Sequence, residues 1–110
     1  MARETLGTHR VDTENADALR AEHRRELKQL LGKLKSGLAE LSKTHSEQAQ
    51  SIAGFARAAS HEATRTAPNP RLLNHALEGL KASVEEIEVS HPRLVQTVGA
   101  VATLLASMGV

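Results

Sequence analysis

The sequence predicts an all-α protein, and three observations support that class. Apolar residues recur at spacings of three and four in four separate segments, which is the period of one helix face. Phe55 is the single aromatic residue, so the core candidates are Leu, Ile, Val and Ala, and sheet-favouring side chains are scarce. The three prolines fall only between the four segments. At 110 residues, the chain has room for one domain with a modest core.

The first helix is predicted over residues 15–42, after a tail at residues 1–14 that lacks apolar periodicity and should be flexible. Extended backwards, its seam reaches Arg24 and Arg20, so we expect the first turns to project beyond the core. Gly32 and Gly37 weaken this helix by up to about 1 kcal/mol each relative to Ala. They mark either close approach of another helix or variation on an exposed face. The seam itself has the alternating spacing of a coiled coil: Leu27, Leu31, Leu34, Leu38 and Leu41.

The second helix is predicted over residues 45–65. Thr44 and Glu47 have the spacing of a capping box, which satisfies free amides at a helix start. If that box is not used, one long helix could continue across residues 43–46. Because small residues allow close approach, this helix should lie flat against the first as an antiparallel hairpin. Its seam lies beside Phe55 and consists of Ala49, Ile52, Ala56, Ala59 and Ala63.

The third and fourth helices both follow prolines. Asn69 should cap a helix over residues 70–89, with Pro70 in the first turn, where a missing N–H costs nothing. Ser90 or His91 should cap the last helix, which Pro92 opens. The third helix carries the stripe Leu73, Leu77, Leu80, Val84 and Ile87. The fourth carries Leu94, Val98, Val101, Leu105 and Met108, flanked by Val95, Ala102 and Leu104.

These elements predict one helical domain over residues 15–110, with hairpins at 15–65 and 70–110 and a linker at 66–70. The two hairpins should form a four-helix bundle, either within one chain or across a dimer. No two of the four segments repeat one another in sequence.

The last helix predicts an interface, because no charged side chain follows Arg93. One chain of this size offers few surfaces to cover such a helix. We therefore expect self-association, a dimer first, or docking on a protein partner. Its 17 residues from 94 span about 25 Å, short of a hydrocarbon core of about 30 Å, so we expect no membrane anchor. The expected interface residues are Leu94, Val98, Val101, Leu105 and Met108.

The sequence predicts a non-enzymatic protein without a metal, cofactor or small-molecule substrate. Cysteine is absent, the glycines are scattered, and the six histidines do not converge by spacing. Glu85, Glu86 and Glu88 are interpreted as a solvated face that could attract the basic helix or a second copy. The polar N-terminus has no signal-peptide core, and a cytoplasmic location is expected.

Nucleic-acid binding is the alternative function, for an accessory subunit that uses the basic helix at residues 20–35. Phosphate contacts could come from Arg20, Arg24, Arg25 and Lys28. Stacking aromatics are missing, however, and the pI of 8.2 is below the usual basic footprint. A small subunit of a larger bacterial assembly is the third hypothesis, with another protein covering the apolar helix.

Two stretches of the C-terminal segment form a recognisable ending: residues 88–94, Glu-Val-Ser-His-Pro-Arg-Leu, and residues 104–110, Leu-Leu-Ala-Ser-Met-Gly-Val. In these residues the segment resembles the short bacterial proteins of the domain-of-unknown-function 4404 family. The resemblance covers residues 72–110 well, and the first hairpin matches in its leucine-rich pattern from about Leu27 onward. It implies a small helical bacterial protein and transfers no catalytic or binding residue. The motif is interpreted as a fold signature, in which His91 and Pro92 start a helix and Gly109 ends it.

Overall fold

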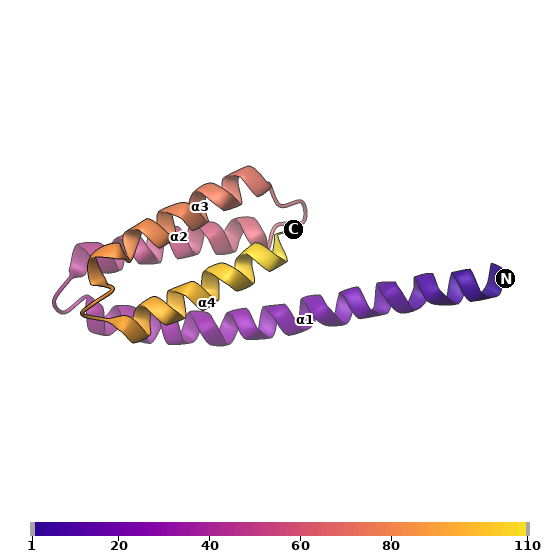
Figure 1. The fold of residues 1–110 in the computed structure, drawn as a ribbon, viewed down its shortest axis with the longest axis horizontal. Helices are drawn as coiled ribbons and strands as arrows, with labels where there is room; N and C mark the ends of the chain where they lie inside the picture. The colour runs from indigo at the N-terminus through magenta and orange to yellow at the C-terminus, as the bar shows by residue number, and fades with distance from the viewer. Residues whose placement is uncertain (1, 110) are drawn as a thin grey trace.

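A computed structural model describes the backbone of residues 2–109 and the side chains of residues 17–109. The elements are α1 (Ala2–Leu41), α2 (Ser46–Ala63), α3 (Pro70–Ser83), the short 3₁₀ helix η1 (Glu85–Ile87) and α4 (Pro92–Met108). The four α-helices pack side by side with alternating direction (Figure 1). The all-α class and the predicted four-helix bundle are therefore confirmed, and the bundle forms within one chain.

Helix α1 is longer than the sequence pattern predicted. It begins at Ala2 rather than near Asn15, because no proline interrupts it and each residue added to an existing helix gains a hydrogen bond. Its N-terminal part leaves the bundle, and the molecule measures 63 Å in its longest dimension against 24 and 20 Å in the others (Figure 1). Leu27 is its first buried side chain among those described, so the projection past Arg24 and Arg20 was predicted correctly. The flexibility expected of residues 1–14 stays a prediction, because their side chains lie outside those that the structure describes.

The corner between α1 and α2 differs from the predicted capping box. The N-cap position is His45, and no side chain there caps the helix. The Thr44 hydroxyl instead shares a hydrogen bond of 2.8 Å with Nδ1 of His45. Thr44 thus lies one residue too early to reach the free amides. The chain still breaks between α1 and α2, and the single long helix does not form.

Helix α2 contacts α3 more extensively than it contacts α1, which differs from the expected pairing within the first hairpin. The small buried side chains of α2 permit this close approach. At its tightest point the Phe55 ring covers Gly79 of α3, where an added Cβ would overlap the ring. The helices α2 and α3 therefore form the most extensively packed pair, and α1 and α4 make the next most extensive contact.

Helix α3 begins as predicted and ends early. The Asn69 side chain accepts hydrogen bonds from the amides of Arg71 (3.0 Å) and Leu72 (3.3 Å), and Pro70 occupies the first turn. The helix ends at Ser83, whose hydroxyl donates to the Leu80 carbonyl at 2.6 Å. A helix continued to residue 89 would place three carboxylates at its negative end, which is unfavourable. The tighter η1 keeps the whole predicted stripe buried: Leu73, Leu77, Leu80, Val84 and Ile87.

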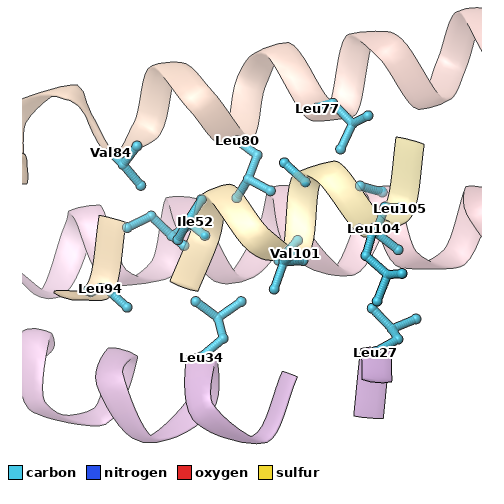
Figure 2. Packing of buried hydrophobic residues seen from close by; sticks show 14 of the residues in the cluster. Leu27, Leu34, Ile52, Leu77, Leu80, Val84, Leu94, Val101, Leu104 and Leu105 are labelled. Carbon is cyan, nitrogen blue, oxygen red and sulfur yellow. The ribbon is translucent and has the colours of Figure 1, made fainter. Parts of the chain in front are cut away.

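Helix α4 lies in the core and contacts each of the other three helices. Figure 2 shows Val101 and Leu104 directed toward α1, and Leu77 and Leu80 directed from α3 toward α4. The expectation that one chain could not cover this helix is therefore wrong. The fully buried side chains of the molecule include Val98, Val101 and Leu105.

The two glycines of α1 have different surroundings. A Cβ at Gly37 would lie 2.7 Å from Cδ1 of Leu94, so this glycine marks the close approach of α4. A Cβ at Gly32 would meet no atom within 4 Å. Close approach of another helix therefore explains Gly37, and variation on an exposed face explains Gly32.

Candidate interaction site

The predicted interface residues of α4 divide between the core and one end of the bundle. Leu94, Val98, Val101 and Leu105 are buried inside the chain. They are core side chains here, and no partner could reach them without opening the bundle. Met108 is half-buried and lies at the end of the bundle from which α1 projects. Of the five, only Met108 is available to a partner.

The polar interruptions of α4 explain how one chain accommodates a helix without charges. Gln96, Gly99, Thr103 and Ser107 are all exposed. They form the solvent-facing side of α4, while the leucines and valines face inward. An uncharged helix thus has an adequate polar face, built from amide, hydroxyl and backbone groups.

A groove of about 690 Å³ lies where α1 leaves the bundle. We call it the basic groove. One wall is the projecting part of α1, and the others are the α2–α3 loop and the end of α4. Its lining comprises Leu19, Arg20, His23, Arg24, Ala63, Thr64, Arg65, Thr66, Pro68, Pro70, Ser107, Met108 and Gly109.

Among its described lining residues, the basic groove carries positive charge and no carboxylate side chain. Its lining includes Arg20, Arg24 and Arg65 but neither Asp nor Glu. Among the described side chains, Arg20 and Arg24 have no carboxylate within ion-pair distance. The same lining includes apolar side chains, among them Leu19 and Met108. The groove therefore combines cationic and apolar groups on one concave surface.

Glu62 holds the loop that forms one rim of the groove. Nη1 of Arg65 donates to both of its carboxylate oxygens, at 3.1 and 2.9 Å. The amide of Asn69 donates to Oε1 at 3.2 Å. The Arg65 hydrogen bonds lower the pKa of the Glu62 carboxyl, burial opposes them, and the Asn69 amide lowers it further. Glu62 thus fixes both Arg65 and the residue that caps α3.

Sequence reasoning missed Glu62, although a signal was present. Glu62 lies on the apolar face of α2, next to Ala59 and Ala63, and Arg65 follows at the i,i+3 spacing of helix ion pairs. A carboxylate inside an otherwise apolar stripe needs a partner. That requirement and the spacing together would have predicted the contact.

Two of the four predicted nucleic-acid contacts line the basic groove. Arg20 and Arg24 belong to its lining, and Arg25 and Lys28 are exposed on α1 outside it. The structure brings Arg20 and Arg24 together with Arg65 and Met108, from elements far apart in sequence. Nucleic-acid contact by the four residues stays a prediction.

At the opposite end of the bundle, two histidines meet. The rings of His45 and His91 are edge to face with centroids 5.5 Å apart. Ser90 shares a 2.8 Å hydrogen bond with Nδ1 of His91, as Thr44 does with His45. Both histidines are N-caps without a side-chain capping bond, with φ,ψ of −135°, 63° and −135°, 61°. Residues 41–45 and 87–91 share the pattern Leu/Ile-x-x-Thr/Ser-His, a short repeat that the sequence analysis did not find.

The corner between α3 and α4 carries acidic residues, and we call residues 85–89 the acidic corner. Ile87 is fully buried, whereas Glu85, Glu86 and Glu88 are exposed. Val89 is 95% exposed, the highest value among the exposed large apolar side chains described. Nε2 of Gln48 on α2 donates to Oε2 of Glu86 at 2.8 Å. The acidic corner is thus anchored by one apolar side chain and one hydrogen bond to α2.

Two further observations concern the part of the chain that the structure describes. His, Asp and Glu side chains there form no group of three or more that could hold a metal ion. None of the helices in residues 2–109 combines the length and apolar character needed to cross a membrane.

Comparison with known proteins supports the resemblance found in the sequence. A model of a domain of unknown function, DUF4404, matches residues 27–110. Searches of curated proteins and of solved structures gave no match. The match begins at Leu27, the first described side chain of α1 that enters the core, and it contains all of α2, α3 and α4. Since it spans more than half of the sequence and the complete bundle, the chain belongs to the DUF4404 family.

Proposed function

We propose that this protein is a non-enzymatic helical interaction protein that binds an acidic protein segment in the basic groove. The observation that carries the proposal is the described lining of that groove, which joins three arginines to apolar side chains and includes neither Asp nor Glu. A partner segment with acidic and apolar groups would neutralise Arg20 and Arg24 and cover Leu19 and Met108. Charge complementarity of this kind favours selective encounter.

A protein segment fits the groove better than a nucleic acid does. Phosphates would contact the arginines but would leave the apolar lining uncovered. Single-stranded nucleic acids also stack their bases on aromatic side chains, and Phe55, the single aromatic residue, is not among the lining residues. Nucleic-acid binding is therefore the second candidate, favoured by Arg20 and Arg24, which have no ion-pair partner among the described side chains.

The partner could equally be one component of a larger assembly, in which this chain is a small subunit. The basic groove would then be its contact with that assembly. A cytoplasmic location is part of this proposal, because a chain without cysteine forms no disulfide that would need an oxidising compartment.

Affinity capture with the full chain tests the proposal. The wild type is compared with Arg20→Glu/Arg24→Glu, which reverses the groove. The matched control is Arg25→Glu/Lys28→Glu, which makes the same charge change on the same helix outside the groove. We expect a captured protein to be retained by wild type and control, to be lost with the groove variant, and to rebind when both proteins are purified.

Nuclease treatment separates the two candidate functions. Capture that survives nuclease and depends on Arg20 and Arg24 supports protein binding. Capture that nuclease abolishes assigns the groove to nucleic acid instead. Equal behaviour of the groove and control variants would contradict the proposed use of the groove.

A further inference from the structure

We infer that the basic groove of one copy accepts the acidic corner of a second copy, so that the chain assembles head to tail. The inference rests on the proposed function and names the occupant of the same groove. It is independent of the buried stripe of α4, because both surfaces are exposed on the folded chain.

The two surfaces match in charge and in apolar content. The described lining of the groove combines cations with apolar side chains and includes neither Asp nor Glu. The acidic corner presents three exposed carboxylates around Val89, which is almost completely exposed. In the docked pair, Val89 would contact the apolar lining while Glu85 and Glu88 approach Arg20 and Arg24. Each feature of one surface thereby has a partner on the other.

Both surfaces are held in place before they meet. Burial of Ile87 and the hydrogen bond from Gln48 fix the acidic corner. The packed rings of His45 and His91 brace the same end of the bundle. On the groove side, Glu62 binds the α2–α3 loop. Since little chain must be ordered on association, more of the contact free energy remains as affinity.

The contact must form between copies rather than within one. The α3–α4 corner lies at one end of the bundle, and the α2–α3 loop and the end of α4, which line the groove, lie at the other (Figure 1). Such a contact joins two different surfaces and can repeat from copy to copy. The area available is small, and the attraction is partly electrostatic. We therefore expect reversible, salt-sensitive association.

Sedimentation of the full chain tests the inference. At low salt, the mean mass should rise with concentration to at least twice the chain mass of 11.8 kDa. It should return to the chain mass in about 0.5 M salt, where the Debye length falls to about 4 Å. A mean mass that levels off at two copies is expected for a closed pair in which the contact forms twice. A mean mass that keeps growing with concentration is expected for an open chain. The charge-reversed variants below identify the contact in either case.

Charge-reversed variants make the test specific. Arg20→Glu/Arg24→Glu reverses the groove, and Glu85→Lys/Glu88→Lys reverses the corner while leaving Glu86 bonded to Gln48. Each variant alone should stay at the mass of one chain, and an equimolar mixture of the two should associate. The control Arg25→Glu/Lys28→Glu should behave as the wild type. Circular dichroism of each variant verifies that its helix content is unchanged.

A wild type that keeps the mass of one chain up to hundreds of micromolar overturns the inference. So does a mixture of the two folded variants that fails to associate. If the chain stays single while groove-dependent capture of another protein persists, the head-to-tail contact is wrong and the proposed function stands. If the groove variant changes neither association nor capture, both are wrong.

Discussion

Glu62 shows how one side chain can organise a whole end of the bundle. It receives hydrogen bonds from Arg65 and from the amide of Asn69, and Asn69 in turn caps α3. Loss of the Glu62 carboxylate should therefore weaken the contacts of α2, of α3 and of the loop between them. Ion pairs of fully exposed residues lack this effect because they hold no backbone in place.

Replacing Glu62 with Gln should lower stability most at neutral pH. The pKa of the carboxyl is below its ordinary value of 4.5 in the folded chain, so folding favours the ionised form. Its contribution is complete above the unfolded pKa and disappears as the pH falls through the folded pKa. Urea unfolding near pH 7 and near pH 3 should show a difference between wild type and variant that shrinks in acid. A difference that grows in acid would contradict the assigned cause.

Local signals at the residue scale were predictable where they act within one turn. The Asn69–Pro70 start of α3 was predicted correctly because cap and proline act on the next few amides. The Thr44 cap was wrong by one residue, since the Thr44 hydroxyl pairs with His45 instead. The contact of His45 with His91 joins positions 46 residues apart (91 − 45), and no periodicity within one helix encodes it.

At the scale of the helices, inward and outward faces decide what each position tolerates. On α4 the completely buried Leu105 and the exposed Thr103 lie two residues apart. On α1 the same contrast separates Gly37, under Leu94, from Gly32 in open space. Each pair therefore compares an inward-facing and an outward-facing position of the same helix.

Leu105→Ala should cost about 2–5 kcal/mol of unfolding free energy, because it leaves a cavity in the core. Thr103→Ala should change stability by less than about 0.5 kcal/mol. Since Leu105 packs within its own chain, the midpoint of thermal unfolding of the chain should not depend on protein concentration in about 0.5 M salt, where the head-to-tail contact is screened. A midpoint that rises clearly with protein concentration at both low and high salt would indicate that Leu105 lies in an interface between copies, as the sequence predicted.

Gly32→Ala should stabilise the chain by up to about 1 kcal/mol through helix propensity. Gly37→Ala should gain less, because the new Cβ must displace the Leu94 side chain. Thermal unfolding of both variants gives the comparison. Equal gains would mean that Leu94 moves aside freely and that the close approach of α4 has no energetic weight.

At the scale of the molecule, the chain consists of a bundle and a projecting helix. The family match and the buried core both begin at Leu27. The bundle was predictable because four amphipathic stripes must cover one another. The pairing of α2 with α3 was not, because the Ala-rich face of α2 suits either neighbour and side-chain shape decides between them.

A fragment of residues 27–110 should fold with a thermal midpoint within a few degrees of the full chain. It keeps all the buried side chains among those that the structure describes, and it loses the wall of the groove formed by Leu19, Arg20 and Arg24. It should therefore fail to associate head to tail. A fragment that does not fold would show that the projecting helix stabilises the bundle, contrary to its exposed side chains.

The Phe55 ring above Gly79 also has a practical use. As the one Phe in a chain without Trp or Tyr, it gives aromatic proton signals that belong to a single known position apart from those of the histidines. Its ring current should displace the α-proton signals of Gly79 from their unfolded positions as long as α2 and α3 stay in contact. One proton spectrum therefore monitors the packing of α2 against α3 directly, in any variant, without a label.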